Sequence, residues 1–146
     1  MTDVASPPAR IVLGLDGSVV AARAARWAAA LARAIGAEVV AVHAVGLLSL
    51  IDGEVRPSDQ VRDRLRALLA DDWCAPLSGA AVAHQPVLED GPAALVLLRV
   101  AEREGADLIV MGSRGIGAID GVLLGSTSHY VAQLAPVPVV IVPPDR

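Results

Sequence analysis

Two glycine-containing segments are the residues of this chain best suited to bind a ligand. Residues 112–115 (GSRG) follow an apolar run, and residues 125–128 (GSTS) open a helical segment. Glycines after a buried strand let the backbone turn tightly and approach a ligand closely. The N–H groups and dipole at a helix start bind anions, and Arg114 adds a charge-assisted bond. Each segment alone is more typical of an ordinary glycine turn or a Ser-capped helix, but the two in this order, after a strand and before a helix, favour a phosphate site.

A carboxylate follows the first apolar run of the chain. Asp16 lies in residues 14–18 (GLDGS), directly before a helical segment. One interpretation is a helix N-cap, which stabilises a helix by about 1 kcal/mol. The other is a carboxylate that faces a ligand and accepts hydrogen bonds from it. Both interpretations hold if Ser18 caps the helix and Asp16 faces the ligand.

No motif of the sequence predicts a catalytic or metal centre. All 12 basic residues are arginines, so a Walker A loop and a Schiff-base lysine are excluded. The glycines match neither the dinucleotide fingerprint nor a nucleophile elbow. His43 lies in an apolar run and is expected to be a core histidine, while His129 is expected to have a packing or surface role. The single cysteine, Cys74, has no cysteine partner for a disulfide or a zinc site.

The elements that must position these residues alternate along the chain. Five apolar runs without polar alternation predict strands buried on both faces, at residues 10–15, 38–45, 81–88, 107–111 and 137–142. Helical segments are expected at residues 19–35, ending at Gly36, and at residues 58–73 with Ser58 as N-cap. Two more are expected at residues 90–104 with Asp90 as cap, and at residues 126–134. The connection from Gly46 to Pro57 is predicted to be irregular.

This alternation predicts an α/β fold with a parallel sheet and helices on both faces. Ligands of such open sheets bind beyond the carboxyl ends of the strands. Asp16 and both glycine segments follow predicted strands, so we expect them at that edge. Residues 1–146 are expected to form a single domain with its core at about residues 10–142.

Composition narrows the classes of partner. A net charge of −4 does not attract nucleic acid or an anionic membrane, and three aromatic residues are too few to stack the bases of a single strand. A site for a flat apolar group would therefore have aliphatic walls. The N-terminus lacks the apolar region of a signal peptide, and no apolar run is long enough to span a membrane. We expect a cytoplasmic protein.

The spacing of these motifs resembles the universal stress protein family. The pattern is Gly112-x-x-Gly115, nine residues, then Gly125-Ser126, together with IVLGLDGS at residues 11–18 and DLIVMGSRG at residues 107–115. The resemblance implies a Rossmann-like five-stranded parallel sheet of order 3-2-1-4-5 and, for the branch with this glycine pattern, bound ATP. Transferred by position, the nucleotide-binding residues would be Gly14, Asp16, Ala44, Met111, Gly112, Arg114, Gly115, Gly125, Ser126, Thr127 and Ser128.

The resemblance also implies a homodimer. The run from Val137 to Val142 would form an apolar sheet edge, which pairing with a second copy would cover; a helix or the C-terminal tail is the alternative cover.

We therefore expect an ATP-binding stress or signalling protein with little or no hydrolysis. Mg²⁺ would be held by the phosphates and water. The alternatives are a cyclic AMP-binding protein, a slow ATPase and a dimeric interaction module without nucleotide.

Overall fold

The structure is a computed structural model that describes residues 6–46, 48–50, 53–55, 57–115 and 124–145. Its strands are β1 (Arg10–Gly14), β2 (Glu38–Val45), β3 (Leu48–Leu50), β4 (Gly53–Val55), β5 (His84–Asp90), β6 (Leu108–Gly112) and β7 (Val139–Val142). Its helices are α1 (Val19–Ile35), α2 (Asp59–Ala67), the π-helical η1 (Leu68–Trp73), α3 (Ala75–Gly79), α4 (Ala93–Arg103) and α5 (Ser126–Leu134).

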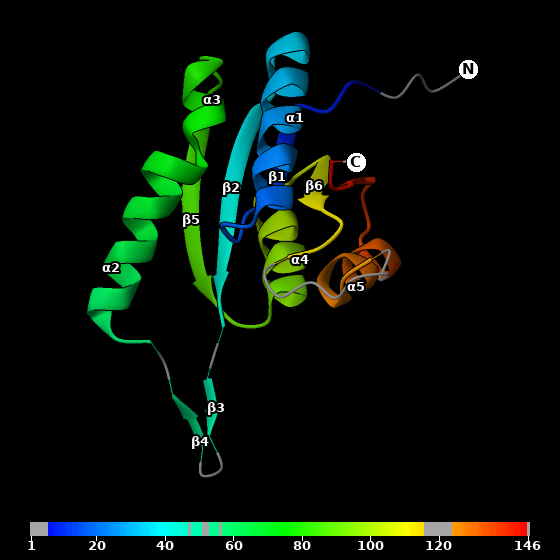
Figure 1. The fold of residues 1–146 in the computed structure, drawn as a ribbon. Coiled ribbons are helices and arrows are strands. Elements are labelled where there is room, and N and C mark those ends of the chain that lie inside the picture. The colour runs from blue at the N-terminus through cyan, green and yellow to red at the C-terminus, as the bar shows by residue number, and fades with distance from the viewer. Residues whose placement is uncertain (1–5, 47, 51–52, 56, 116–123, 146) are drawn as a thin grey trace.

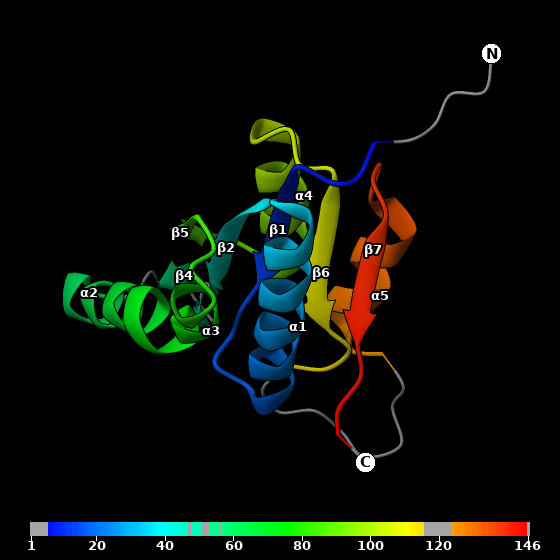
Figure 2. The same cartoon turned by 90° about the horizontal axis from the view of Figure 1, so that it is seen from above.

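Five of these strands form one parallel sheet in the order β5-β2-β1-β6-β7. Counted along the chain within this sheet, the order is third, second, first, fourth, fifth, so the predicted fold class is confirmed. Helices cover both faces (Figures 1 and 2), with α1 on one side and α4 and α5 on the other. Strand β1 is central, and its carboxyl end lies beside that of β6.

The core has one layer on each face of the sheet. Alternating residues of β1, such as Ile11 and Leu13, pack with the alanine-rich side of α1 and with the segment from η1 to α3. Val12 and Ile109 point the other way, against α4 and α5. Six buried alanines on α1 let that helix approach the sheet closely. Both faces of the central strands are therefore apolar, which explains their continuous apolar sequence.

Helices α1 and α5 match their predicted bounds, and α1 does so because the signals at both of its ends are strong. Ser18 caps α1, its Oγ accepting a hydrogen bond from the backbone N–H of Ala21 at 3.1 Å. Gly36 ends α1 in the left-handed conformation, with φ of 71°. Helix α5 also spans the predicted residues, but its N-cap is Gly125 and no side chain caps it.

The β5 region differs from its prediction. The strand was expected at residues 81–88 and lies at His84–Asp90, because its pairing with β2 continues to the Val45–Asp90 pair. Asp90 was expected to cap the next helix, but it ends the strand and forms an ion pair with Arg62 of α2. Pro92 takes the N-cap position of α4, without a side-chain hydrogen bond.

Two other segments also correct the sequence interpretation. The single helix expected at residues 58–73 is α2 followed by η1, in which the N–H of Cys74 bonds to the carbonyl of Leu69, five residues back, at 3.1 Å. This wider turn buries Leu69 and Cys74 together in the core. Within residues 46–57, β3 and β4 form an antiparallel hairpin, at the bottom of Figure 1.

The remaining strands shift by one or two residues. β1 ends at Gly14, β6 spans Leu108–Gly112 and β7 begins at Val139.

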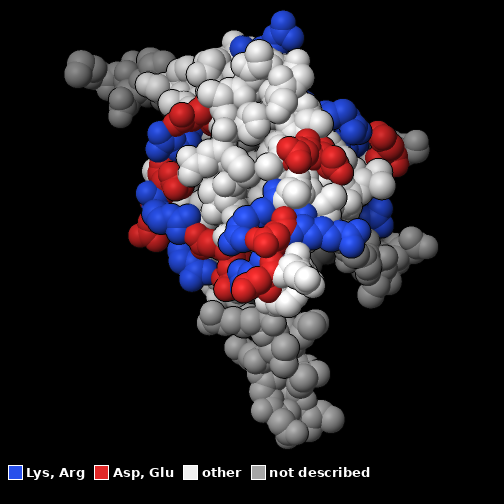
Figure 3. Space-filling view, turned by 90° about the vertical axis from the view of Figure 1, so that its left-hand side faces the viewer, with Lys and Arg blue, Asp and Glu red and all other residues white. Residues whose placement is uncertain are grey.

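Charged side chains of both signs alternate on the face that carries α2. Figure 3 shows basic and acidic groups interleaved there, with neither sign predominant. Arg66 and Asp63 form an ion pair within α2 at 3.1 Å, an exposed contact of small energetic value. Across the described ranges, no helix has the length and apolarity needed to cross a membrane.

Candidate functional site

One cavity of about 490 Å³ lies at the carboxyl ends of β1 and β6. Its size falls in the range of small-molecule sites. The cavity gathers all the residues predicted as a site: Gly14, Asp16, Ala44, Met111, Gly112, Arg114, Gly115, Gly125, Ser126, Thr127 and Ser128. Residues 116–123, between the two glycine segments, lie outside the described residues.

One side of the cavity is aliphatic. Val42 and Ala44 of β2 point to the same side of the sheet as Ala93 and Leu97 of α4, and all four line the cavity with Met111. A Cβ at Gly14 would lie 3.2 Å from the Leu97 side chain, so a larger residue there would narrow this space. The sequence did not identify Val42 and Leu97 as site residues, although Val42 is two residues from Ala44 on the same face. This wall suits a flat, weakly polar group.

Ser18, not Asp16, supplies the side-chain cap in this region, and Asp16 faces the cavity. Ser18 supplies the side-chain cap of α1, and Asp16 Oδ1 accepts a hydrogen bond from the Ser18 N–H at 2.9 Å. The other oxygen points across the cavity, since a Cβ built on Gly115 would lie 2.4 Å from Asp16 Oδ2. The carboxylate therefore occupies the space that the absent Gly115 side chain leaves.

The other glycine of the first segment has a packing role. A Cβ on Gly112 would lie 2.8 Å from the Val20 side chain and 3.2 Å from the backbone of Val20 in α1. Gly112 therefore lets β6 approach the first turn of α1. A larger residue here would displace that helix, so a Gly112→Val variant would perturb the fold as well as the cavity.

The polar side of the cavity is the start of α5. Its first N–H groups have no acceptor within the helix, which makes a site for negative charge. Ser126 is exposed and Thr127 half-buried at this end. The hydroxyl of Ser128 is committed elsewhere, since it donates to the carbonyl of Ser113 at 2.8 Å and contacts that of Gly125 at 3.1 Å. Ser128 therefore joins α5 to the end of β6, and its hydroxyl is already bonded within the protein.

Ser113 is a buried polar residue that the sequence interpretation did not select. The residue is 3% exposed and lines the cavity, and its Oγ has no hydrogen-bond partner in the part of the chain that the structure describes. A buried hydroxyl without a partner is costly, which is consistent with a ligand or water supplying one.

The histidines and the cysteine lie outside the cavity. His43 Nδ1 lies 2.7 Å from the carbonyl oxygen of Leu15, which agrees with the expected core role, and His129 is exposed on α5. Burial raises the pKa of the Cys74 thiol to about 11. Among the described residues, no three His, Cys, Asp or Glu side chains are grouped to hold a metal ion.

Comparison with known proteins identifies relatives over nearly the whole chain. The model of the universal stress protein family matches residues 8–143. A universal stress protein of Thermus aquaticus is 40% identical over 133 residues, covering 90% of this chain and 96% of the relative.

Solved structures of similar proteins share the fold. A universal stress protein solved in complex with cAMP has a TM-score of 0.73 at 26% identity, covering 94% of this chain and 98% of that one. The universal stress protein of Archaeoglobus fulgidus in complex with dAMP has a TM-score of 0.68 at 24% identity, covering 91% and 96% of the two chains. From the family match and the Thermus relative, this chain belongs to the universal stress protein family.

Proposed function

We propose that this protein binds an adenine nucleotide, ATP with Mg²⁺, and uses it to control a stress or signalling response with little or no hydrolysis. The observation that carries the proposal is the convergence of an aliphatic wall, a carboxylate and a helix N-terminus on one cavity. Family membership and the relative solved with cAMP support an adenine nucleotide as the ligand.

The two sides of the cavity suit the two ends of such a ligand. The wall formed by Val42, Ala44 and Leu97 would hold the adenine without aromatic stacking. The Asp16 carboxylate would accept hydrogen bonds from adenine or ribose. Backbone N–H and carbonyl groups at Gly14 and Met111 would donate to these groups or accept from them. The phosphates would lie at the start of α5, against backbone N–H groups and the hydroxyls of Ser126 and Thr127. Arg114 would supply the positive charge.

The residues present fit a magnesium ion carried by the phosphates. Asp16 is the single carboxylate among the described residues of the cavity lining, and its Oδ1 already accepts from Ser18. The ion would therefore take its oxygen ligands from the phosphates and water. The described lining residues include no histidine or glutamate, and the one carboxylate among them, Asp16, is bonded to the Ser18 N–H, so slow or absent hydrolysis is expected.

Cyclic AMP is the second candidate ligand. The relative solved with cAMP is 26% identical over nearly all of both chains. A single cyclic phosphate needs fewer contacts than a triphosphate, so the start of α5 would contribute less to its affinity.

Isothermal titration calorimetry with ATP–Mg²⁺, AMP, cAMP and GTP tests the proposal. We expect saturable heat with ATP and weaker or no heat with GTP. Tighter binding of cAMP than of ATP would favour the second candidate, and no heat with any nucleotide would favour an interaction module. Phosphate release above that of a Ser126→Glu variant would establish a slow ATPase.

The proposal includes a homodimer through β7. This strand is an edge of the sheet, and a second hollow beside it is lined by Trp27, Arg23, Arg26 and residues of β7. Trp27 is 41% exposed there. A second copy pairing along β7 would cover both the open edge and this tryptophan.

A proline in β7 tests this assembly. The carbonyls of Pro138 and Val142 accept hydrogen bonds from the N–H groups of Ile109 in β6 and of Ser113 directly after β6. The alternation of a parallel ladder therefore directs the N–H of Ile141 outward. Ile141→Pro removes that outward donor. We expect a monomer in analytical ultracentrifugation, and an unchanged dimer would rule out pairing through this edge.

A further inference from the structure

Trp73 packs against the turn that carries Asp16, from the side away from the cavity. The turn contains Gly17 in the left-handed region, with φ of 82°. A Cβ on Gly17 would lie 2.7 Å from Trp73 Cζ2 and 3.1 Å from Cε2, so the indole lies directly on the glycine. Trp73 is the last residue of η1, and π-helical turns are often found at functional sites.

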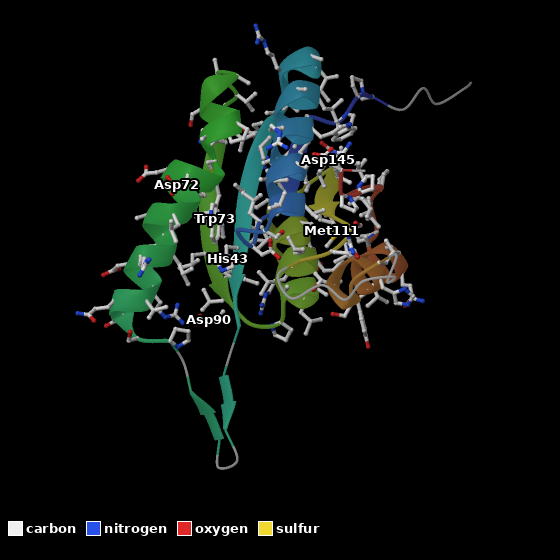
Figure 4. The ribbon with its side chains drawn as sticks, viewed as in Figure 1. His43, Asp72, Trp73, Asp90, Met111 and Asp145 are labelled. Carbon is white, nitrogen blue, oxygen red and sulfur yellow. The ribbon has the colours of Figure 1, made fainter. Side chains whose placement is uncertain are left out.

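His43 supports the same turn from β2. Its neighbours Val42 and Ala44 face the cavity, so His43 points to the opposite face of the sheet. Since the Leu15 carbonyl accepts only, the Nδ1 of His43 carries the hydrogen of the 2.7 Å bond between them. The imidazole also meets the Trp73 indole edge-on, with ring centroids 5.0 Å apart and an interplanar angle of 76°. Figure 4 shows the two side chains together between η1 and the sheet.

These contacts hold the backbone on both sides of Asp16. Leu15 is fixed by His43 and by its own N–H bond to the Val42 carbonyl at 2.8 Å, and Gly17 is covered by Trp73. The Asp16 carboxylate must fit the narrow space beside Gly115. A small shift of the turn would therefore misdirect the carboxylate.

We infer that Trp73 and His43 are positioning residues for the nucleotide, and that η1 responds when the cavity is filled. This inference rests on the proposed function. Neither residue lines the cavity, so both act through the Leu15–Gly17 backbone. The ion pair of Arg62 with Asp90 ties α2, which leads into η1, to the end of β5. Through His43 and Trp73, the turn of residues 15–17 is held between β2 and η1, which are far apart in sequence.

Tryptophan fluorescence provides the first test, because the chain has two tryptophans. In a Trp27→Phe variant the emission comes from Trp73, and we expect a saturable change on titration with ATP–Mg²⁺. Its midpoint should equal the dissociation constant from calorimetry. The matched control is Trp73→Phe, in which the remaining Trp27, beside β7, should give no change.

Substitutions of His43 provide the second test. His43→Asn keeps a donor near the Leu15 carbonyl, whereas His43→Leu has a similar size and no donor. We expect about tenfold weaker ATP binding for His43→Leu, because a hydrogen bond to the ligand through Asp16 is misaligned. His43→Asn should restore most of the wild-type affinity. Circular dichroism melts check that both variants fold.

The outcomes separate the two levels of the proposal. No ATP binding by the wild-type protein would overturn the proposed function and this inference with it. Normal ATP binding with unchanged Trp73 emission, or with equal affinities for His43→Leu and wild type, would overturn the inference alone.

Discussion

An added Cβ meets a neighbour most closely at Gly115, among the described glycines, and Gly115→Ala tests the importance of this contact with Asp16. The added Cβ would start 2.4 Å from Asp16 Oδ2, and real Cβ atoms essentially never approach a neighbour within 3.0 Å. Gly115 has no positive φ, so alanine fits the backbone without strain. The conflict is therefore with the carboxylate, which must move.

The expected loss follows from the hydrogen bonds that Asp16 makes. Movement of the carboxylate weakens its bond to the Ser18 N–H, now 2.9 Å, and removes its contact with the ligand. A hydrogen bond to a charged group contributes about 1.5–3 kcal/mol, so ATP affinity should fall by about 10- to 100-fold. Stability should change by no more than about 1 kcal/mol, because Gly115 is exposed and alanine lowers the entropy of the unfolded chain.

Calorimetry with ATP–Mg²⁺ and a thermal melt measure the two effects. Gly79→Ala is the matched control, because a Cβ there meets nothing within 4 Å and the residue lies outside the cavity. Asp16→Ala and the Asp16→Ala/Gly115→Ala double variant should bind equally weakly if Gly115 acts through Asp16. Wild-type affinity in Gly115→Ala would refute this reasoning.

Three further predictions concern charge. Arg114→Gln should weaken ATP binding about tenfold in calorimetry but leave adenosine binding unchanged, because Arg114 would contact phosphate; equal losses for both ligands would contradict that position. Ser126→Glu should weaken ATP binding at least about tenfold, because the new carboxylate repels the phosphates. The fold should survive, because a negative charge at a helix N-terminus stabilises the helix. Undiminished ATP affinity would place the phosphates elsewhere. Burial raises the pKa of Cys74 to about 11 from 9.0, so unfolding releases its proton between these values. The free energy of unfolding from urea titrations should therefore be unaffected by this thiol below pH 9 and fall by about 1.4 kcal/mol per pH unit between pH 9 and about pH 11. Cys74→Ala should lack this part of the fall, and parallel pH profiles would contradict the assignment.

The sequence predicts the central strands and α1 well because each carries a redundant local signal. β2 has a continuous apolar run, and α1 has both a serine cap and a C-terminal glycine. β5 is at a sheet edge, where polar residues are tolerated, so its length depends on pairing with β2. The wider turn of η1 depends on burying Leu69 with Cys74, a tertiary requirement that helical periodicity does not encode.

The candidate site was predictable where residues follow strand ends. Asp16 and the glycine segments lie at that edge, as the topology of a parallel sheet requires. The wall residue Leu97 comes from a helix that packs on the sheet, and its place in the cavity depends on that packing. The roles of the glycines also depend on residues distant in sequence. Gly112 packs against α1, and Gly115 leaves space for the Asp16 carboxylate.

Chemical-shift mapping of backbone amides during titration with ATP–Mg²⁺ tests the location of the nucleotide most directly. The largest shifts are predicted at residues 14–16, 111–115 and 125–128, the segments that line the cavity. Saturable shifts confined to other surfaces, or no shifts at millimolar ATP, would contradict the assignment of this cavity as the nucleotide site.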